Sequence, residues 1–90
     1  MEIEFDPAKR EKTLQERGLD FAHAVNLFAG RHLTVQDTRL NYPEDRFITV
    51  GHLARRLVVI VWTPRGEVRR IISMRKANER EKIFYRLQVG

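Results

Sequence analysis

Ninety residues suffice for one small domain, and the absence of cysteine excludes disulfides and thiolate metal sites. The net charge of +5 is unevenly distributed: residues 1–45 hold 6 basic and 9 acidic side chains, whereas residues 46–90 hold 11 and 3. This asymmetry favours an anionic partner, nucleic acid first, because guanidinium groups bind phosphates through paired hydrogen bonds. The simpler alternative is a solvated surface on a basic protein.

The N-terminal third predicts a short strand followed by two helices. Residues 3–5 alternate like a strand, and a helix over residues 7–17 is expected because Asp6 can accept bonds from free helical N–H groups. A second helix is expected over residues 21–29. Its predicted buried face consists of Phe21, Ala24, Val25 and Phe28.

From residue 32 onward the apolar period changes from 3.6 to 2, which predicts four strands. We expect these strands over residues 32–36, 46–52, 57–63 and 67–74. The third is apolar on both faces and should be the most central. A tight turn over Thr63–Gly66 should make the fourth strand antiparallel to the third.

A basic helix closes the chain. It is expected over residues 77–87, with Ile83, Phe84 and Leu87 facing the core. The predicted fold class is α+β: a small antiparallel β-sheet packed by two N-terminal helices and one C-terminal helix, in a single domain over residues 1–90.

No feature of the sequence indicates a membrane or a secreted location. The N-terminus is charged from its second residue, and the longest apolar run, Leu57–Trp62, is far shorter than the roughly 20 residues of a membrane helix. We therefore expect a soluble, cytoplasmic protein with no membrane partner.

Several sequence blocks occur in a family-specific order. They are Phe5–Lys9, Gly18–Phe21, Glu44–Gly51, and Arg70–Ala77 with Arg80–Tyr85. Together they resemble the BrnT family, ribonuclease toxins of bacterial type II toxin–antitoxin pairs. The chain departs from that pattern at Thr13 and Arg17, where family members often carry Asn and His, which leaves the role of the first helix open.

The resemblance implies a RelE-like fold, an endoribonuclease activity and two partners. One partner is the RNA substrate. The other is a BrnA-like antitoxin, whose ribbon-helix-helix domain binds DNA, so that DNA is contacted only through the antitoxin complex. Neither a metal nor a cofactor is expected, because a 2′-OH can attack the neighbouring phosphate without one.

The basic C-terminal stretch supplies the expected catalytic residues. Arginine suits stabilisation of charge on the phosphate, because its donor fork stays protonated. We favour Arg75 first, at the expected joint between strand and helix, then Arg80 and Arg70; Arg70 should face away from Arg69 if the strand is regular. Tyr85 is a further catalytic candidate, with a core-packed ring as the equal alternative.

Three more basic residues are expected to bind RNA: Lys76, Lys9 and Arg46. The plainer interpretations are a solvated helix residue for Lys9 and a salt-bridged strand start for Arg46. The three histidines belong to no motif, and no His, Asp or Glu cluster has metal-ligand spacing.

Two alternatives to a toxin enzyme remain open at this stage. The chain could be a non-catalytic module that binds nucleic acid, or an interaction module whose basic surface binds an acidic protein. Charge alone does not separate them, because RNA and an acidic antitoxin are attracted to the same surface.

Overall fold

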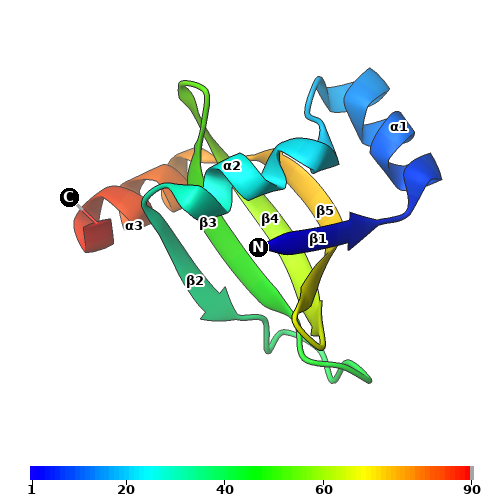
Figure 1. The fold of residues 1–90 in the computed structure, drawn as a ribbon. Coiled ribbons are helices and arrows are strands. Elements are labelled where there is room, and N and C mark those ends of the chain that lie inside the picture. Colours follow the sequence, from blue (N-terminus) through cyan, green and yellow to red (C-terminus); the bar gives the residue numbers. More distant parts are fainter. Residues whose placement is uncertain (90) are drawn as a thin grey trace.

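The computed structural model describes residues 1–89 and shows a five-stranded sheet with three α-helices (Figure 1). In chain order, the elements are β1 (Glu2–Phe5), α1 (Pro7–Arg17), the 3₁₀ turn η1 (Phe21–His23), α2 (Ala24–Ala29), β2 (His32–Gln36), β3 (Phe47–Leu53), β4 (Arg56–Arg65), β5 (Val68–Lys76) and α3 (Glu79–Val89). No helix within residues 1–89 is long and apolar enough to span a membrane.

The sheet is mixed, with strand order β1-β5-β4-β3-β2. The α+β class is confirmed. The central position of the apolar strand is also confirmed, because two strands lie on each side of β4 in the sheet. The expectation of a purely antiparallel sheet was wrong: β1 pairs with β5 in parallel, while the other pairs are antiparallel. The RelE-like topology stays a prediction.

The first helix has the predicted bounds and end signals. The Asp6 carboxylate accepts a hydrogen bond from the Ala8 N–H at 2.9 Å, and Gly18 ends the helix at φ 69°, where a side chain would be strained. The second predicted helix instead begins as the 3₁₀ turn η1 before α2. That start rotates the buried face, so Leu27 is fully buried whereas Val25 is only half-buried.

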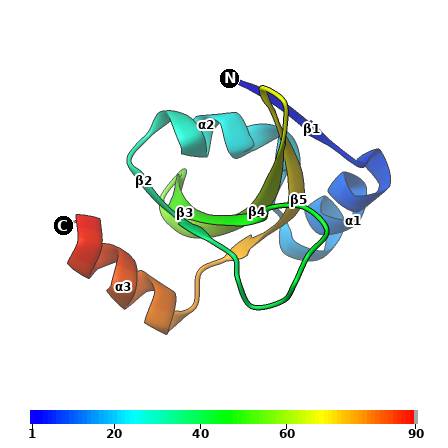
Figure 2. The ribbon, with the colours of Figure 1, turned by 90° about the horizontal axis from the view of Figure 1, so that it is seen from below.

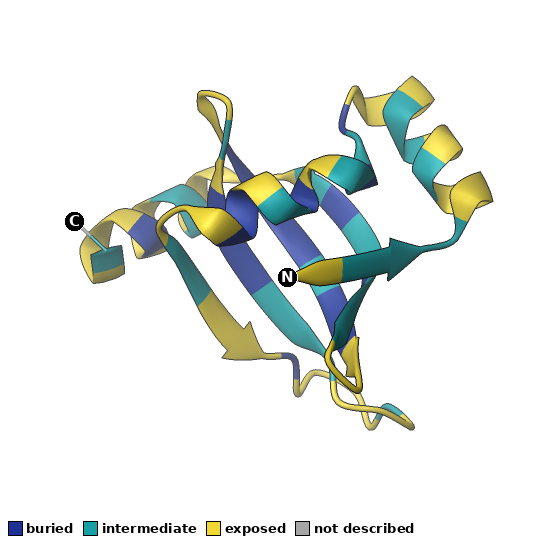
Figure 3. Ribbon diagram, in the orientation of Figure 1, coloured by how far each residue is buried: buried dark blue, intermediate teal, exposed yellow. Residues whose placement is uncertain are grey.

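The sheet curls around α2, which lies on its inner face (Figure 2). The main core fills the space between them and is built from aromatic and aliphatic side chains of both layers. Its buried members are Leu19, Phe21, Ala24, Leu27, Phe28, Val58, Ile60, Trp62, Ile71 and Met74. Figure 3 shows this burial in the middle strands and in segments along α2.

The outer face of the sheet is covered only in part, by α3. A smaller buried cluster forms there from Val50, Leu57, Val59, Ala77 and Tyr85. The expected core face of α3 was wrong, because Ile83, Phe84 and Leu87 are 53%, 46% and 78% exposed. The helix packs through Tyr85 and Val89 instead.

Two hairpins connect the three central strands. The β4–β5 turn was predicted over Thr63–Gly66, but β4 continues through Arg65, and Gly66 with Glu67 forms a two-residue loop. Gly66 has φ 61°, which suits the first central position of such a turn. In the β3–β4 hairpin the corresponding residue is Ala54, at φ 58°.

Candidate functional site

A β-bulge in β5 decides which arginines share a face of the sheet. The pairing of β4 with β5 shifts partway along, so that Arg70 pairs with Thr63 whereas Arg75 pairs with Val59. Thr63 and Val59 are four residues apart on β4 and therefore share a face. Arg70 and Arg75 consequently both lie on the outer face, although strict alternation would separate them. The strand is therefore irregular at this point.

Arg69 and Arg70 lie on opposite faces, as expected. The Arg69 guanidinium lies on the inner face, 4.3 Å from the ring centroid of Trp62 and 4.6 Å from that of Phe28. Burial there lowers the pKa of Arg69. Arg70 instead forms an ion pair with Glu4 of β1 at 3.1 Å. About 13 Å of strand separates Arg70 from Arg75, and each guanidinium pairs with a different carboxylate, Glu4 or Glu81.

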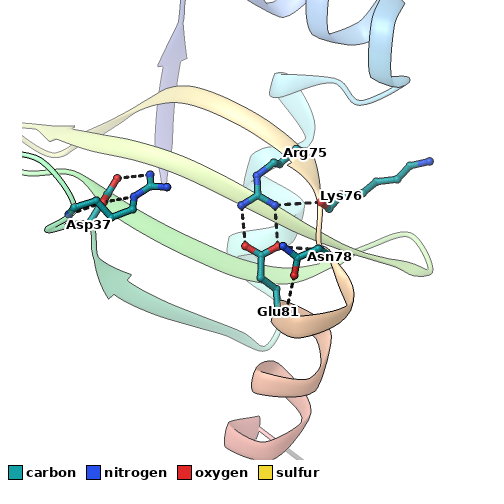
Figure 4. A network of polar contacts seen from close by, with 6 residues as sticks. Asp37, Arg75, Lys76, Asn78 and Glu81 are labelled. Atoms are coloured by element: carbon teal, nitrogen blue, oxygen red, sulfur yellow. Dashed lines mark hydrogen bonds and ion pairs between the residues drawn. The ribbon is translucent and has the colours of Figure 1, made fainter.

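Arg75 is held in a network of polar contacts on the outer face (Figure 4). It lies within β5 and not at the expected joint, because the strand continues to Lys76. Its Nη1 and Nη2 atoms donate to the Glu81 carboxylate at 2.8 and 2.7 Å. Glu81 also accepts the Asn78 N–H at 2.9 Å, while the Asn78 side chain accepts the Glu81 N–H at 2.8 Å. This reciprocal capping box fixes the start of α3 and the direction of Arg75 together.

The electrostatics of this network keep both partners ionised. The hydrogen bond to Glu81 raises the pKa of Arg75, against opposing effects of burial and of the nearby Arg39. The hydrogen bond from Arg75 lowers the pKa of Glu81, helped by the Asn78 N–H and by the positive charge of Arg39. Arg75 is still 41% exposed, so part of its donor fork faces solvent.

The loop between β2 and β3 brings Arg39 to the same face. Asp37 is buried and accepts hydrogen bonds from Arg39 Nε and Nη2, both at 2.8 Å. The pKa of Asp37 is lowered to about 2, chiefly by these bonds. The Arg39 side chain remains 66% exposed. We name Arg39, Arg75 and Arg80 the arginine cluster; sequence analysis missed Arg39 because it lies in an irregular loop.

The remaining predicted residues lie apart from Arg75 or are engaged elsewhere. Arg46 packs over the Tyr42 ring at 4.1 Å, and its buried Nε has no hydrogen-bond partner among residues 1–89. Lys9 is exposed on α1, on the opposite side of the molecule from α3 (Figures 1 and 2). Tyr85 is buried, and its hydroxyl donates to the Arg31 carbonyl at 3.2 Å.

An apolar groove of about 330 Å³ adjoins the arginine cluster. Strands β2 and β3 form one wall, and the exposed side of α3 forms the other. The lining residues are Leu33, Val35, Ile48, Val50, Arg80, Glu81 and Phe84. Arg80 therefore places a cation at the rim, next to the network of Arg75 and Glu81.

A second, basic hollow lies on the other side of α3, and sequence analysis did not find it. Its volume is about 380 Å³, and it lies between the β3–β4 hairpin, the end of β5 and α3. Its cations are Arg55, Arg56, Lys76, Lys82 and Arg86. Lys76 extends here, away from Arg75, as Figure 4 shows. The sequence feature that could have revealed this hollow is Arg55 followed directly by Arg56, between two segments predicted to be strands.

Neither site has the composition of a metal centre. In the described part of the chain, no three His, Asp or Glu side chains lie close enough together to hold a metal ion. The acidic side chains of the site, Asp37 and Glu81, are each engaged by an arginine.

A comparison with known protein families identifies the family of this chain. A family model described as the ribonuclease toxin BrnT of type II toxin–antitoxin systems matches residues 5–81. The chain belongs to the BrnT family. No curated protein matches it. The match includes Arg39, Arg75, Arg80 and Glu81, but it ends before Lys82 and Arg86 of the basic hollow.

Membership confirms the family resemblance and sets the general function. BrnT proteins are ribonuclease toxins, and a type II system pairs the toxin with an antitoxin. RNA and a protein antitoxin are therefore the partners that the surface of this chain has to accommodate. Residue roles follow only from the geometry above.

Proposed function

We propose that this chain, as one toxin domain over residues 1–90, is a metal-independent endoribonuclease that inhibits translation in the cytoplasm. The observation that carries the proposal is the Arg75–Glu81 pair beside Arg39 and Arg80, on a sheet face left open by α3. A guanidinium with a fixed direction and a partly free fork suits a phosphate whose charge is increasing.

The proposed reaction uses the RNA itself as the nucleophile. The 2′-oxygen attacks phosphorus, the bond from phosphorus to the 5′-oxygen breaks, and the 2′ proton is removed while the 5′-oxygen gains one. The products are a 2′,3′-cyclic phosphate and a 5′-hydroxyl. Arg75 stabilises the negative charge on the pentacovalent phosphate, and Arg80 or Arg39 assists from the rim. Glu81 is a positioning residue, because it acts through Arg75.

The proposed antitoxin is a BrnA-like ribbon-helix-helix protein, through which alone the toxin contacts DNA. It inhibits by covering the arginine cluster. The cluster lies on one face with the apolar groove beside it, so a single bound segment blocks both. A complex that left Arg75 and Arg80 open to solvent would contradict this direct occlusion.

Substitution of Arg75 tests the catalytic proposal. Arg75→Ala should lower the cleavage rate by about 10²–10³-fold, because one preorganised donor to the developing charge is lost. Arg75→Lys should recover only part of the rate, since a single ammonium lacks the planar fork. Cleavage of labelled RNA in EDTA is the measurement, with RNA affinity and antitoxin binding measured alongside.

Arg65→Ala is the matched control, because Arg65 is an exposed arginine at the far β4–β5 hairpin. It should leave the rate unchanged. RNA with a 2′-deoxy sugar at the cut site should bind and remain whole. Cleavage of that RNA at the same position, or loss of activity in EDTA, would contradict the mechanism. Tight RNA binding without any cleavage would instead favour a non-catalytic binding module.

A further inference from the structure

The basic hollow beside α3 concentrates charge of one sign. Five of the 17 Lys and Arg side chains line it, and its lining includes no carboxylate. Lys82 forms an ion pair with Glu79 at 3.2 Å, and Glu79 is 82% exposed. The other four cations form no ion pair within the described residues. Like charges this close repel one another, so their shared position is explained best by an anion that binds among them.

The hollow has a fixed floor. Leu57, Ala77 and Tyr85 are buried beneath it, and the Ala77 N–H donates to the Leu57 carbonyl at 2.9 Å. Tyr85 anchors α3 to the chain before β2 through its bond to the Arg31 carbonyl. These contacts hold Lys82 and Arg86 on one wall, opposite the hairpin arginines. The cations are therefore arranged by the fold and are not scattered along a flexible surface.

The hairpin wall has an unusual backbone. Ala54 adopts φ 58°, a left-handed conformation that is strained for a non-glycine residue. The two-residue turn that requires this angle places Arg55 and Arg56 at the tip of the hairpin, where both line the hollow. Strain of this kind persists where the surrounding structure fixes it, and it is common at binding sites.

We propose that the hollow binds the phosphate backbone of the same single-stranded RNA, away from the phosphate that is cleaved. This inference rests on the proposed function and extends its substrate site. Arg75 and Lys76 are consecutive in β5 and point to opposite sides, so an RNA strand that crosses the start of α3 passes from the arginine cluster to the hollow. His52, exposed at the rim, offers a ring on which a base can stack.

RNA fits the hollow better than an acidic protein segment for two reasons. The hollow is large enough, at about 380 Å³, for a nucleotide-sized group, and its arginines match phosphate oxygens through paired donors. It is also separate from the exposed apolar groove, whereas protein interfaces usually bury apolar side chains at their centre.

The test compares two double charge reversals with the same change in net charge. Arg55→Glu with Arg86→Glu alters the hollow, and Lys12→Glu with Arg65→Glu alters exposed cations elsewhere. Affinity is measured by fluorescence anisotropy with a single-stranded RNA whose 2′-hydroxyls are all methylated, which prevents attack by the 2′-oxygen. Each protein is measured at several salt concentrations, and its fold is checked by circular dichroism.

The hollow variant should bind about tenfold more weakly than the control variant. The slope of log affinity against log salt should become shallower by about 0.7 for each lost phosphate contact. With cleavable RNA, KM should rise while kcat is retained. Arg55→Ala with Arg86→Ala is the gentler pair if the reversal unfolds the protein, and it should shift affinity in the same direction.

Equal affinities for the hollow and control variants would overturn the proposal. So would normal RNA binding combined with loss of antitoxin binding, which would identify the hollow as a protein site. The proposed function can fail while the proposal about the hollow stands. If the wild-type protein bound RNA through Arg55 and Arg86 but never cleaved it, the endoribonuclease activity would be refuted and the hollow would still be an RNA-binding site.

Discussion

Glu81 performs two tasks with one carboxylate, and a conservative substitution separates them. It accepts the Asn78 N–H as part of the capping box, and it holds the Arg75 guanidinium. Glutamine also completes a capping box, whereas alanine does not. Glu81→Gln should therefore lower the melting temperature less than Glu81→Ala does, because alanine also removes the cap, a loss of about 1 kcal/mol of stability.

The cleavage rate should respond differently from stability. Both variants remove the charged partner of Arg75, so both should cleave RNA about tenfold more slowly, the free-energy equivalent of roughly 1.4 kcal/mol in the barrier. Thermal unfolding and single-turnover cleavage are the two measurements. Glu79→Gln, on the exposed side of the same helical turn, is the control and should change neither. A Glu81→Gln enzyme with the full rate would remove Glu81 from the positioning role.

Individual residues of the site were predictable to very different degrees. Asn78 followed three residues later by Glu81 is a readable helix-start pattern, and its use would have corrected the expected start of α3. The ion pair between Arg75 and Glu81 crosses from a strand to a helix, and no local periodicity predicts it. The cation at Arg39 was equally hidden, because its position depends on the buried carboxylate of Asp37.

At the scale of elements, packing of α2 on β3 depends on Gly51. A Cβ atom at Gly51 would lie 2.9 Å from Leu27 Cδ2 and 3.1 Å from His32 Cβ. Leu27 is fully buried and has little freedom to move. Gly51→Ala should therefore destabilise the protein by about 1–3 kcal/mol through overpacking.

Gly30 provides the matched control for this substitution. A Cβ atom there meets only carbonyl oxygens of Leu27 and Asn26, at 3.9 and 4.0 Å, and its φ of −94° is open to any residue. Urea unfolding of the two alanine variants gives the comparison. Equal midpoints for the two would show that α2 shifts to accommodate the methyl group and that Gly51 is not a packing constraint.

Periodicity predicted the existence of most elements but not the faces that they present. The bulge in β5 reverses the orientation of residues beyond it, and only the pairing with β4 determines it. The 3₁₀ start at η1 likewise changed which residues of α2 are buried. In α3 the apolar residues have helical spacing, but nothing in residues 1–89 covers Phe84 and Leu87 fully. Tertiary context decides burial in each of these cases.

At the scale of the whole molecule, charge and apolar surface are divided among three adjoining areas. The arginine cluster and the apolar groove share the outer face, and the basic hollow lies beyond α3. The excess positive charge of residues 46–90 predicted a basic surface, but not its division by a helix. RNA and antitoxin are accordingly expected to compete for the arginine cluster, while the hollow contributes to RNA binding alone.

Two aspartates held by arginines, the half-buried Asp20 and the buried Asp37, make the stability of the whole domain sensitive to acid. Asp20 accepts Arg10 Nε and Nη2 at 2.7 and 2.9 Å, which ties α1 to the segment before α2. The bonds from Arg10 are the largest cause that lowers the pKa of Asp20 to about 2, and Asp37 has a pKa of about 2 for the equivalent reason with Arg39. Both values lie below the ordinary aspartate pKa of about 3.9.

The sign of the effect follows from which state binds more protons. Between about pH 4 and pH 2 the unfolded chain takes up protons that the folded carboxylates do not, so stability is fully present above pH 4 and is lost as pH falls toward 2. The melting temperature should therefore decrease over this window. The Asp20→Asn, Asp37→Asn double variant should melt lower at pH 7, because it lacks both ion pairs, and should change less between pH 4 and pH 2. If the wild-type protein and the double variant showed the same pH dependence, these two aspartates would not be the groups that make the fold sensitive to acid.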